Sequence, residues 1–127
     1  MNARIRATKC LAFHYSPSGE LTAIAALKAP DAEYRDAVFK MADSPASYAD
    51  FQLELGWVYV VPAYRRKQVA TEICEQLLLR AAGDCVFATT RSDNAAMGRI
   101  LRACGFAEVG KPFMHRSEQL RLYLRHH

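Results

Sequence analysis

The sequence predicts a mixed α/β fold, in which strands and helices alternate along a single domain spanning residues 1–127. Residues 52–61 are largely apolar on both faces, which is typical of a strand at the centre of a sheet. Residues 69–78 carry apolar side chains in two adjacent rows spaced four residues apart, which is typical of a helix that covers such a sheet. With 127 residues, 51% of them apolar, the chain can bury one core.

The first elements are predicted to be a hairpin and a short helix. Residues 8–15 and 21–28 have strand composition and flank a cluster of turn residues at 16–19. Asp31 is placed to cap a helix, and an Asp-Ser-Pro break at 43–45 ends its pattern. The chain therefore opens with two antiparallel strands followed by a helix.

The remaining elements continue the alternation. The helix after the central strand ends at Gly83, and a short apolar strand at 85–90 follows it. Residues 92–94 offer caps for the next helix, which Gly105 stops. Near the C-terminus, leucines alternate with other residues over 120–125, the period of a strand with one face on the core.

The composition favours a soluble, cytoplasmic protein with an anionic ligand. The apolar stretches are far shorter than the roughly 20 residues that a membrane span needs, and no signal peptide is evident. Seventeen Lys and Arg against thirteen acidic residues give a net charge of +4, too small to indicate nucleic-acid binding on its own. Four cysteines without a C-x-x-C pair are expected to be reduced packing residues: Cys10, Cys74, Cys85 and Cys104.

A basic corner follows the central strand. The strand ends at Pro62, and Arg65, Arg66 and Lys67 precede the apolar helix pattern. A helix start exposes unpaired backbone N–H groups at the positive end of the helix dipole, so cations beside it form a pocket for phosphate. A solvated helix start is the alternative, although each cation there is disfavoured by about 0.3–1 kcal/mol. The phosphate motifs G-x-x-x-x-G-K-[ST] and G-x-G-x-x-G are both absent.

Two blocks of the sequence resemble the N-acetyltransferases of the GNAT superfamily. The corner is similar to their acyl-CoA signature, V-x-P-x-Y-[RQ]-x-x-G-x-[GA], through Val60, Pro62, Tyr64, Arg65 and Ala70. Residues 94–106 resemble the N-x-x-A-x-x-L-Y-x-x-x-G-F helix, at the expected distance downstream, through Asn94, Gly105 and Phe106. Because order, spacing and context agree, the two blocks together are more specific than either alone.

The resemblance implies a GNAT-like central mixed, largely antiparallel sheet with helices on both faces and with the family's N-terminal helices shortened or absent. It also implies acetyl-CoA as co-substrate and no metal. The pyrophosphate would bind at the basic corner, and the pantetheine arm would follow the central strand. The residues expected to bind acetyl-CoA are Val58, Tyr59, Val60, Arg65, Arg66, Lys67, Gln68, Val69, Ala70, Thr71, Asn94 and Met97.

Gln68 departs from the family pattern, which usually has glycine at this position. Glycine lets the backbone approach the pyrophosphate closely. We expect Gln68 to keep helical dihedrals and to turn its side chain away, so that the backbone N–H groups of residues 67–71 still point at the diphosphate.

Glu54 is the general base that the resemblance implies, because some family members use a glutamate at this place in the strand. Six residues separate it from Val60, or roughly 20 Å at about 3.3 Å per residue, close to the reach of a pantetheine arm. A charge in an apolar strand must be paired, protonated or functional, and an ion pair with an arginine is the alternative. A backbone N–H near Trp57 or Val58 would stabilise the oxyanion, and Gly56 is expected to mark a bulge.

Leu101 stands where many family members have a tyrosine that protonates the departing CoA thiolate. A thiol with a pKa of about 8.5 leaves tolerably without an acid, so the substitution need not abolish activity. Tyr59 and Tyr123 are the candidate catalytic substitutes, with a water or His115 as further alternatives. Ordinary packing explains each of these side chains as well.

The predicted function is transfer of an acetyl group from acetyl-CoA to a primary amine of a small molecule or protein, by direct attack in a ternary complex. The acceptor is expected to meet the helix at 31–42, the loop at 44–51 and a loop at 111–117 that follows a short strand at 106–109. Membrane association is not expected, and a homodimer is possible from the sequence. Two alternatives remain: a catalytically impaired acyl-CoA-binding or regulatory module, and a small basic nucleic-acid-binding domain motivated by net charge alone.

Overall fold

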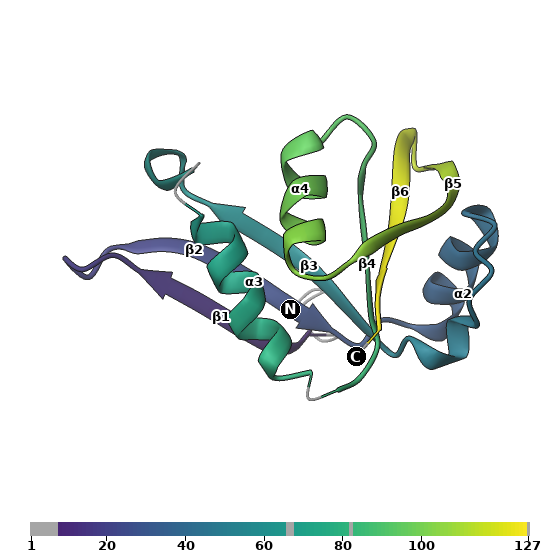
Figure 1. Cartoon of the computed structure of the whole chain (residues 1–127), viewed down its shortest axis with the longest axis horizontal. Coiled ribbons are helices and arrows are strands. Elements are labelled where there is room, and N and C mark those ends of the chain that lie inside the picture. The colour runs from purple at the N-terminus through teal and green to yellow at the C-terminus, as the bar shows by residue number, and fades with distance from the viewer. Residues whose placement is uncertain (1–7, 66–67, 82, 127) are drawn as a thin grey trace.

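The structure, a computed structural model, describes residues 8–65, 68–81 and 83–126. Within these residues the strands form a six-stranded sheet in the order β1-β2-β3-β4-β6-β5, and helices pack against it (Figure 1). The elements are β1 (Thr8–Tyr15), β2 (Leu21–Lys28), α2 (Ala32–Met41), β3 (Leu53–Val60), α3 (Val69–Leu79), β4 (Val86–Arg91), α4 (Ala95–Ala103), β5 (Ala107–His115) and β6 (Glu118–Arg125), with 3₁₀ turns at Tyr48–Asp50 and Pro62–Tyr64.

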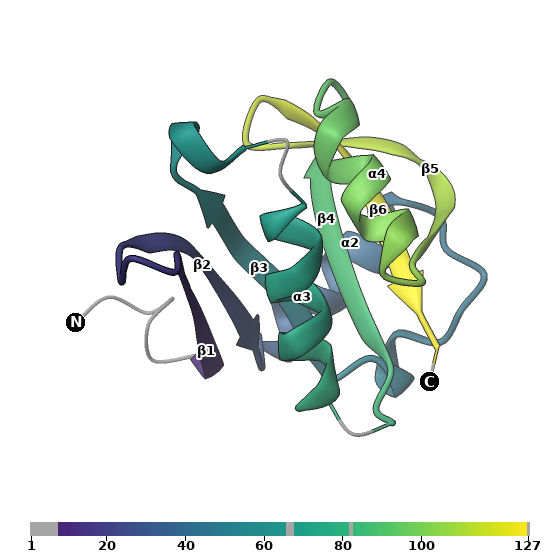
Figure 2. The same cartoon turned by 60° about the vertical axis from the view of Figure 1, so that its left-hand side comes forward.

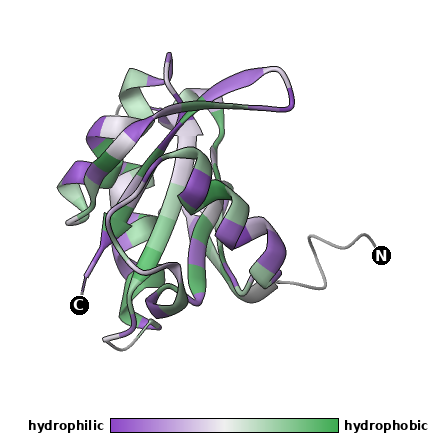
Figure 3. Ribbon diagram, turned by 90° about the vertical axis from the view of Figure 1, so that its right-hand side faces the viewer, coloured by the Kyte–Doolittle hydropathy of each residue, from purple (hydrophilic) through white to green (hydrophobic). Residues whose placement is uncertain are grey.

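Helices cover both faces of the sheet, as predicted (Figure 2). One apolar core joins the sheet to α3 and α4 and includes Ile73 and Leu101. The other joins the sheet to α2 and includes Phe39 and Phe87. Figure 3 shows that the hydrophobic stretches of the ribbon lie mainly in the strands between these helices.

The pairing of the strands leaves one opening in the sheet. The hairpin of β1 and β2 and the central place of β3 are as predicted. Among the described strands only β3 and β4 run parallel to each other, and they pair at Leu53 with Val86 and at Glu54 with Phe87. Beyond Glu54 the two strands separate, as Figure 2 shows. The sheet is therefore mixed but largely antiparallel, with a fork between its two central strands.

The prediction for the segment before β6 is wrong in part. β5 continues through Ala107–His115, so most of the expected loop is strand. Gly110 and Pro112 interrupt the strand period in the sequence, and the ladder with β6 is shifted between Val109 and Phe113. This irregularity breaks the alternation by which a strand is recognised from sequence.

The prediction that the last strand has only one face on the core is also wrong. Leu122 packs in the core on the α2 side, whereas Tyr123 packs in the core beneath α3 and α4. Both side chains are buried, at 0% and 3% exposed. The second face is covered because β6 is an interior strand of the sheet, between β4 and β5.

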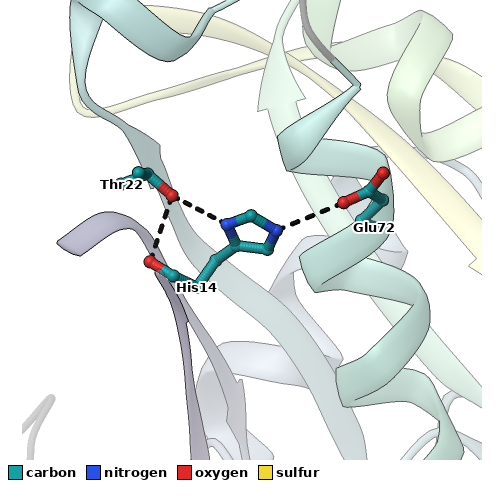
Figure 4. A network of polar contacts seen from close by, with 3 residues as sticks. All are labelled: His14, Thr22 and Glu72. Carbon is teal, nitrogen blue, oxygen red and sulfur yellow. Dashed lines mark hydrogen bonds and ion pairs between the residues drawn. The ribbon is translucent and has the colours of Figure 1, made fainter. Parts of the chain in front are cut away.

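A polar network ties the edge hairpin to α3 (Figure 4). The ladder of β1 and β2 pairs His14 with Ala23 and Tyr15 with Leu21, so Thr22 is an extra, bulged residue. Its hydroxyl donates to the backbone oxygen of His14 at 3.0 Å, and its oxygen lies 2.8 Å from Nδ1 of the same histidine. The other ring nitrogen, Nε2, lies 3.2 Å from a carboxylate oxygen of Glu72 on α3. Buried polar groups of the bulge are thereby satisfied.

Gly110 lies where β5 packs closely against the end of α2. Its φ of +67° lies in the left-handed region, and a Cβ there would lie 2.0 Å from the backbone oxygen of Ala42. That oxygen accepts a hydrogen bond from the N–H of Lys111 at 2.8 Å. Only a residue without a side chain fits this approach of two backbone segments.

We expect Gly110→Ala to lower the free energy of unfolding by about 3 kcal/mol or more, because backbone strain and a steric clash add at this site. Gly19→Ala is the matched control, since Gly19 has a φ of +91° with no heavy atom within 4 Å of the added carbon. The control should lose only about 1–2 kcal/mol. Urea unfolding of the two variants measures the difference, and equal losses would contradict the proposed clash.

Candidate functional site

The corner after β3 is built by a proline turn. The N–H of Val61 donates to the backbone oxygen of Thr22 at 2.8 Å, which extends the pairing with β2, and the 3₁₀ turn Pro62–Tyr64 follows. Arg65 folds back onto the strand, where its Nε donates to the Val60 oxygen at 2.9 Å. The turn and this arginine fix the direction in which the chain leaves the sheet.

Arg65 lies before α3 rather than in its first turn. Arg65 has extended dihedrals, with φ −70° and ψ 151°, and the helix begins at Val69. The alternative of a solvated helix start therefore does not hold for Arg65. Arg66 and Lys67 lie outside the described residues.

Gln68 is the N-cap of α3 and has left-handed dihedrals, with φ 61° and ψ 12°. The expectation that it keeps helical dihedrals is wrong. This is the conformation that glycine adopts most readily, so the glycine of the family pattern suits the backbone here. The side chain of Gln68 makes no capping hydrogen bond, and the first N–H groups of a helix lack acceptors within the helix. The first turn of α3 therefore presents N–H donors and the positive end of the helix dipole.

A groove of about 840 Å³ opens beside this corner, between the end of β3, the start of α3 and one side of α4. Its floor and walls are largely apolar, and Arg65 and Arg99 add positive charge. Every residue predicted to bind acetyl-CoA within the described ranges lines this groove. These residues are Val58, Tyr59, Val60, Arg65, Gln68, Val69, Ala70, Thr71, Asn94 and Met97.

The wall formed by α4 includes residues that the sequence analysis missed. Asn94 caps this helix as expected, since its Oδ1 accepts the N–H of Met97 at 3.0 Å. The helix also brings Ala96, Arg99, Ile100 and Ala103 to the groove, and Tyr64 of the proline turn joins them. Residues three or four positions apart share one face of a helix, so the positions that follow Asn94 and Met97 at this spacing could have been predicted to line the groove.

Glu54 is buried on the other side of the sheet and does not line the groove. It is 3% exposed, its Oε1 lies 3.3 Å from Nζ of Lys28, and its Oε2 accepts a hydrogen bond from the Tyr34 hydroxyl at 3.1 Å. The alternative of an ion pair is thus present, with a lysine rather than an arginine as partner. Glu54 also forms the last β3–β4 pair, with Phe87, so it marks the point where the fork opens.

The bulge expected at Gly56 is confirmed. β2 pairs Ile24 with Tyr59 and Ala26 with Gly56, so three steps along β3 match two along β2. A bulge bends its strand and increases the twist, which helps β3 to leave β4. The backbone around Trp57 and Val58 lies in this irregular segment, and its use as an oxyanion donor stays a prediction.

The family follows from comparison with known proteins. A family model described as the acetyltransferase (GNAT) family matches residues 6–106. The chain belongs to the GNAT acetyltransferase family. A search of curated proteins gave no significant match.

Solved GNAT structures share the fold of this chain. An acetyltransferase of the GNAT family from Streptococcus agalactiae has a TM-score of 0.68 at 17% identity, over 89% of this chain and 62% of its own. The yncA protein of Salmonella typhimurium, solved with its cofactor acetyl-CoA, has a TM-score of 0.63 at 20% identity, over 87% and 61%. A variant of spermidine N-acetyltransferase SpeG from Vibrio cholerae has a TM-score of 0.64 at 12% identity, over 91% and 64%. This chain spans less than two thirds of the length of each.

The two tyrosines proposed as acid catalysts of this GNAT chain lie in different places. Tyr59 is 51% exposed, lines the groove, and has the Arg65 guanidinium 5.7 Å from its ring centroid. Tyr123 is buried beneath α4 and does not line the groove, and a Cβ at Gly98 would lie 2.9 Å from its hydroxyl oxygen. Leu101, at the family's tyrosine position, is fully buried in the core. Of the two, only Tyr59 lines the groove, and it does so at the Arg65 end.

Two of the four cysteines form a buried pair between α3 and α4. All four described cysteines are free thiols, and Cys74 and Cys104 are buried. A hydrogen bond to Cys104, together with burial, raises the pKa of the Cys74 thiol far above its ordinary value, so it stays protonated.

Across the described residues no group of three or more metal-ligating side chains is found, and no described helix is long and apolar enough to cross a membrane.

We expect Gln68→Gly to raise the free energy of unfolding by about 0.5–1 kcal/mol, because glycine removes the strain of a left-handed glutamine. The same substitution at Gln76, an exposed position inside α3, should lower it by about 1 kcal/mol, because glycine is unfavourable within a helix. Thermal and urea unfolding report both values. A loss of stability at both positions would show that the left-handed conformation carries no strain.

Proposed function

We propose that this protein is an acetyl-CoA-dependent N-acetyltransferase that acetylates a primary amine of a small molecule or a protein. The observation that carries the proposal is the groove at the β3–α3 corner, which gathers the residues of both sequence blocks. Two solved neighbours support it: yncA was solved with acetyl-CoA, and SpeG is a spermidine N-acetyltransferase. The reaction would proceed by direct attack in a ternary complex.

The residues present fit two parts of acetyl-CoA, the diphosphate and the pantetheine arm. The diphosphate needs cations and N–H donors, which Arg65 and the first turn of α3 from Val69 to Thr71 supply. The pantetheine arm carries amides, and these need a partner strand. Beyond Glu54, β3 has no ladder partner on its β4 side among the described strand residues, so this edge can pair with an extended ligand.

The chemistry requires a base, an oxyanion donor and a leaving group. Acetyl-CoA supplies the activated acetyl group. Glu54 would accept a proton from the acceptor ammonium, and a backbone N–H of the bulge near Trp57 or Val58 would stabilise the negative charge on the carbonyl oxygen. Tyr59 lies at the Arg65 end of the groove, five residues along β3 from Glu54, which is about 16 Å at about 3.3 Å per residue, so it would not reach the thioester in this structure. The thiolate would leave unaided or take a proton from water.

The second candidate is an acyl-CoA-binding module with impaired catalysis. Two observations favour it. Leu101 offers no proton at the family's tyrosine position, and Glu54 is engaged by Lys28 and Tyr34. This candidate shares the groove with the first and differs only in turnover.

Thermal unfolding with acetyl-CoA, CoA and ATP tests the shared site first. Ligand at 100 times its dissociation constant should add about 2.7 kcal/mol to the stability. Thiol release with a panel of primary amines then separates the enzyme from the binding module. If neither CoA species shifts the unfolding, both candidates are wrong.

A negative charge introduced at Gln68 tests where the diphosphate binds. We expect Gln68→Glu to weaken acetyl-CoA binding about tenfold or more, since a carboxylate of the same shape would stand beside the diphosphate at a cost of about 1.4 kcal/mol. Gln76→Glu introduces the same change on an exposed part of α3 outside the groove and should leave the affinity within about twofold. Equal effects would place the diphosphate elsewhere.

Glu54→Gln tests the base. It keeps the shape of the side chain and removes its ability to accept the proton, so turnover should fall by roughly 10²–10⁴-fold while acetyl-CoA binding persists. Full turnover of this variant across the pH range would exclude Glu54 as the base.

A further inference from the structure

Among the described residues, a lysine of the protein itself holds its amine against the candidate base. Lys28 stands directly opposite Glu54 in the β2–β3 ladder, and its Nζ lies 3.3 Å from Oε1 of that glutamate. Its side chain is only 14% exposed, so the pair is largely shielded from water. A primary amine is therefore already held at the carboxylate that the proposed reaction needs.

Gly56 sets the position of this amine. A Cβ at Gly56 would lie 2.8 Å from Cε and 3.2 Å from Nζ of Lys28, so the end of the lysine chain lies over the bare backbone of the glycine. Gly56 is also the residue at which the β3 bulge begins. The ammonium thus lies beside both the carboxylate and the irregular backbone segment proposed to bind the oxyanion.

The fork would bring the thioester of a bound acetyl-CoA close to Glu54 and Lys28. The groove follows Val58–Val60 along β3, and the strands rejoin at Glu54, roughly 20 Å along β3 from the corner at about 3.3 Å per residue. An arm that starts with its diphosphate at Gln68 and follows β3 ends near the apex of the fork. Within the part of the chain that the structure describes, Lys28 contacts Glu54 at that apex.

We propose that Lys28 is a self-acetylation site, an inference that rests on the proposed acetyltransferase function. Glu54 accepts one proton from the Lys28 ammonium, and the Nζ lone pair then forms a C–N bond with the acetyl carbonyl carbon of acetyl-CoA as the C–S bond breaks. The second proton leaves the nitrogen for the CoA thiolate, giving Nε-acetyl-lysine and CoA thiol, and Glu54 returns its proton to solvent. Acetylation removes the positive charge from the Lys28–Glu54 pair and fills the acceptor position with an amide.

Peptide mapping by mass spectrometry after incubation with acetyl-CoA tests the proposal. Lys40 on α2 and Lys111 on β5 are exposed and serve as internal controls for spontaneous acetylation. We expect Lys28 to be acetylated about 10²-fold faster than either control, the scale of one positioned base. The first-order rate should not change when the protein is diluted, because donor and acceptor lie in one complex.

Two variants test the geometry. Glu54→Gln should slow acetylation of Lys28 by about 10²-fold and leave Lys40 and Lys111 unchanged. Gly56→Ala should also slow it, because the added methyl displaces the end of the lysine chain. Thermal shift with CoA checks that each variant still folds and binds.

Three outcomes would overturn the proposal. If acetyl-CoA binds but Lys28 is acetylated no faster than Lys40 and Lys111, self-acetylation is wrong and the proposed function stands. If Glu54→Gln leaves the rate of Lys28 acetylation unchanged, the base-assisted step is wrong. If acetyl-CoA does not bind, both this proposal and the proposed function fail.

Discussion

The separation of β3 from β4 after Glu54 is the constraint on which the candidate site depends. Two residue pairs hold these parallel strands together, and the rest of β3 is free of β4. The bulge between Gly56 and Tyr59 bends the strand outward. The opening leaves an unpaired strand edge, exposes one side of α4, and provides the room in which the groove lies.

The corner at the end of the fork combines rigid support with local strain. Pro62, the Val61 hydrogen bond and the Arg65 side chain fix the path of the chain. Gln68 then takes left-handed dihedrals, which a glutamine adopts at a cost. Strain of this kind persists only where the surrounding structure imposes it, and it is common at ligand sites. At this corner the strained residue directly precedes the first turn of α3, whose residues Val69–Thr71 line the groove.

Local sequence patterns predicted most of the fold and the corner after β3. The features that could not be predicted depend on contacts between residues far apart in the sequence. The hairpin, the central strand and the caps of α4 follow from residues near one another in the chain. Lys28 as the partner of Glu54 depends on the antiparallel register of two strands, which no local pattern specifies. The dihedrals of Gln68 depend on where the fold needs α3 to start, and the burial of Tyr123 depends on α4 crossing β6. These features are set by tertiary packing, which overrides local preference.

The fork and the corner together are proposed to hold acetyl-CoA. A titration of ¹⁵N-labelled protein with CoA, followed by NMR, tests it at the level of single amides. We expect the largest chemical-shift changes on Val69–Thr71 at the start of α3 and on Val58–Val60 along the open edge of β3. Changes concentrated instead on α2 or on the β1–β2 hairpin, with these amides unaffected, would contradict it.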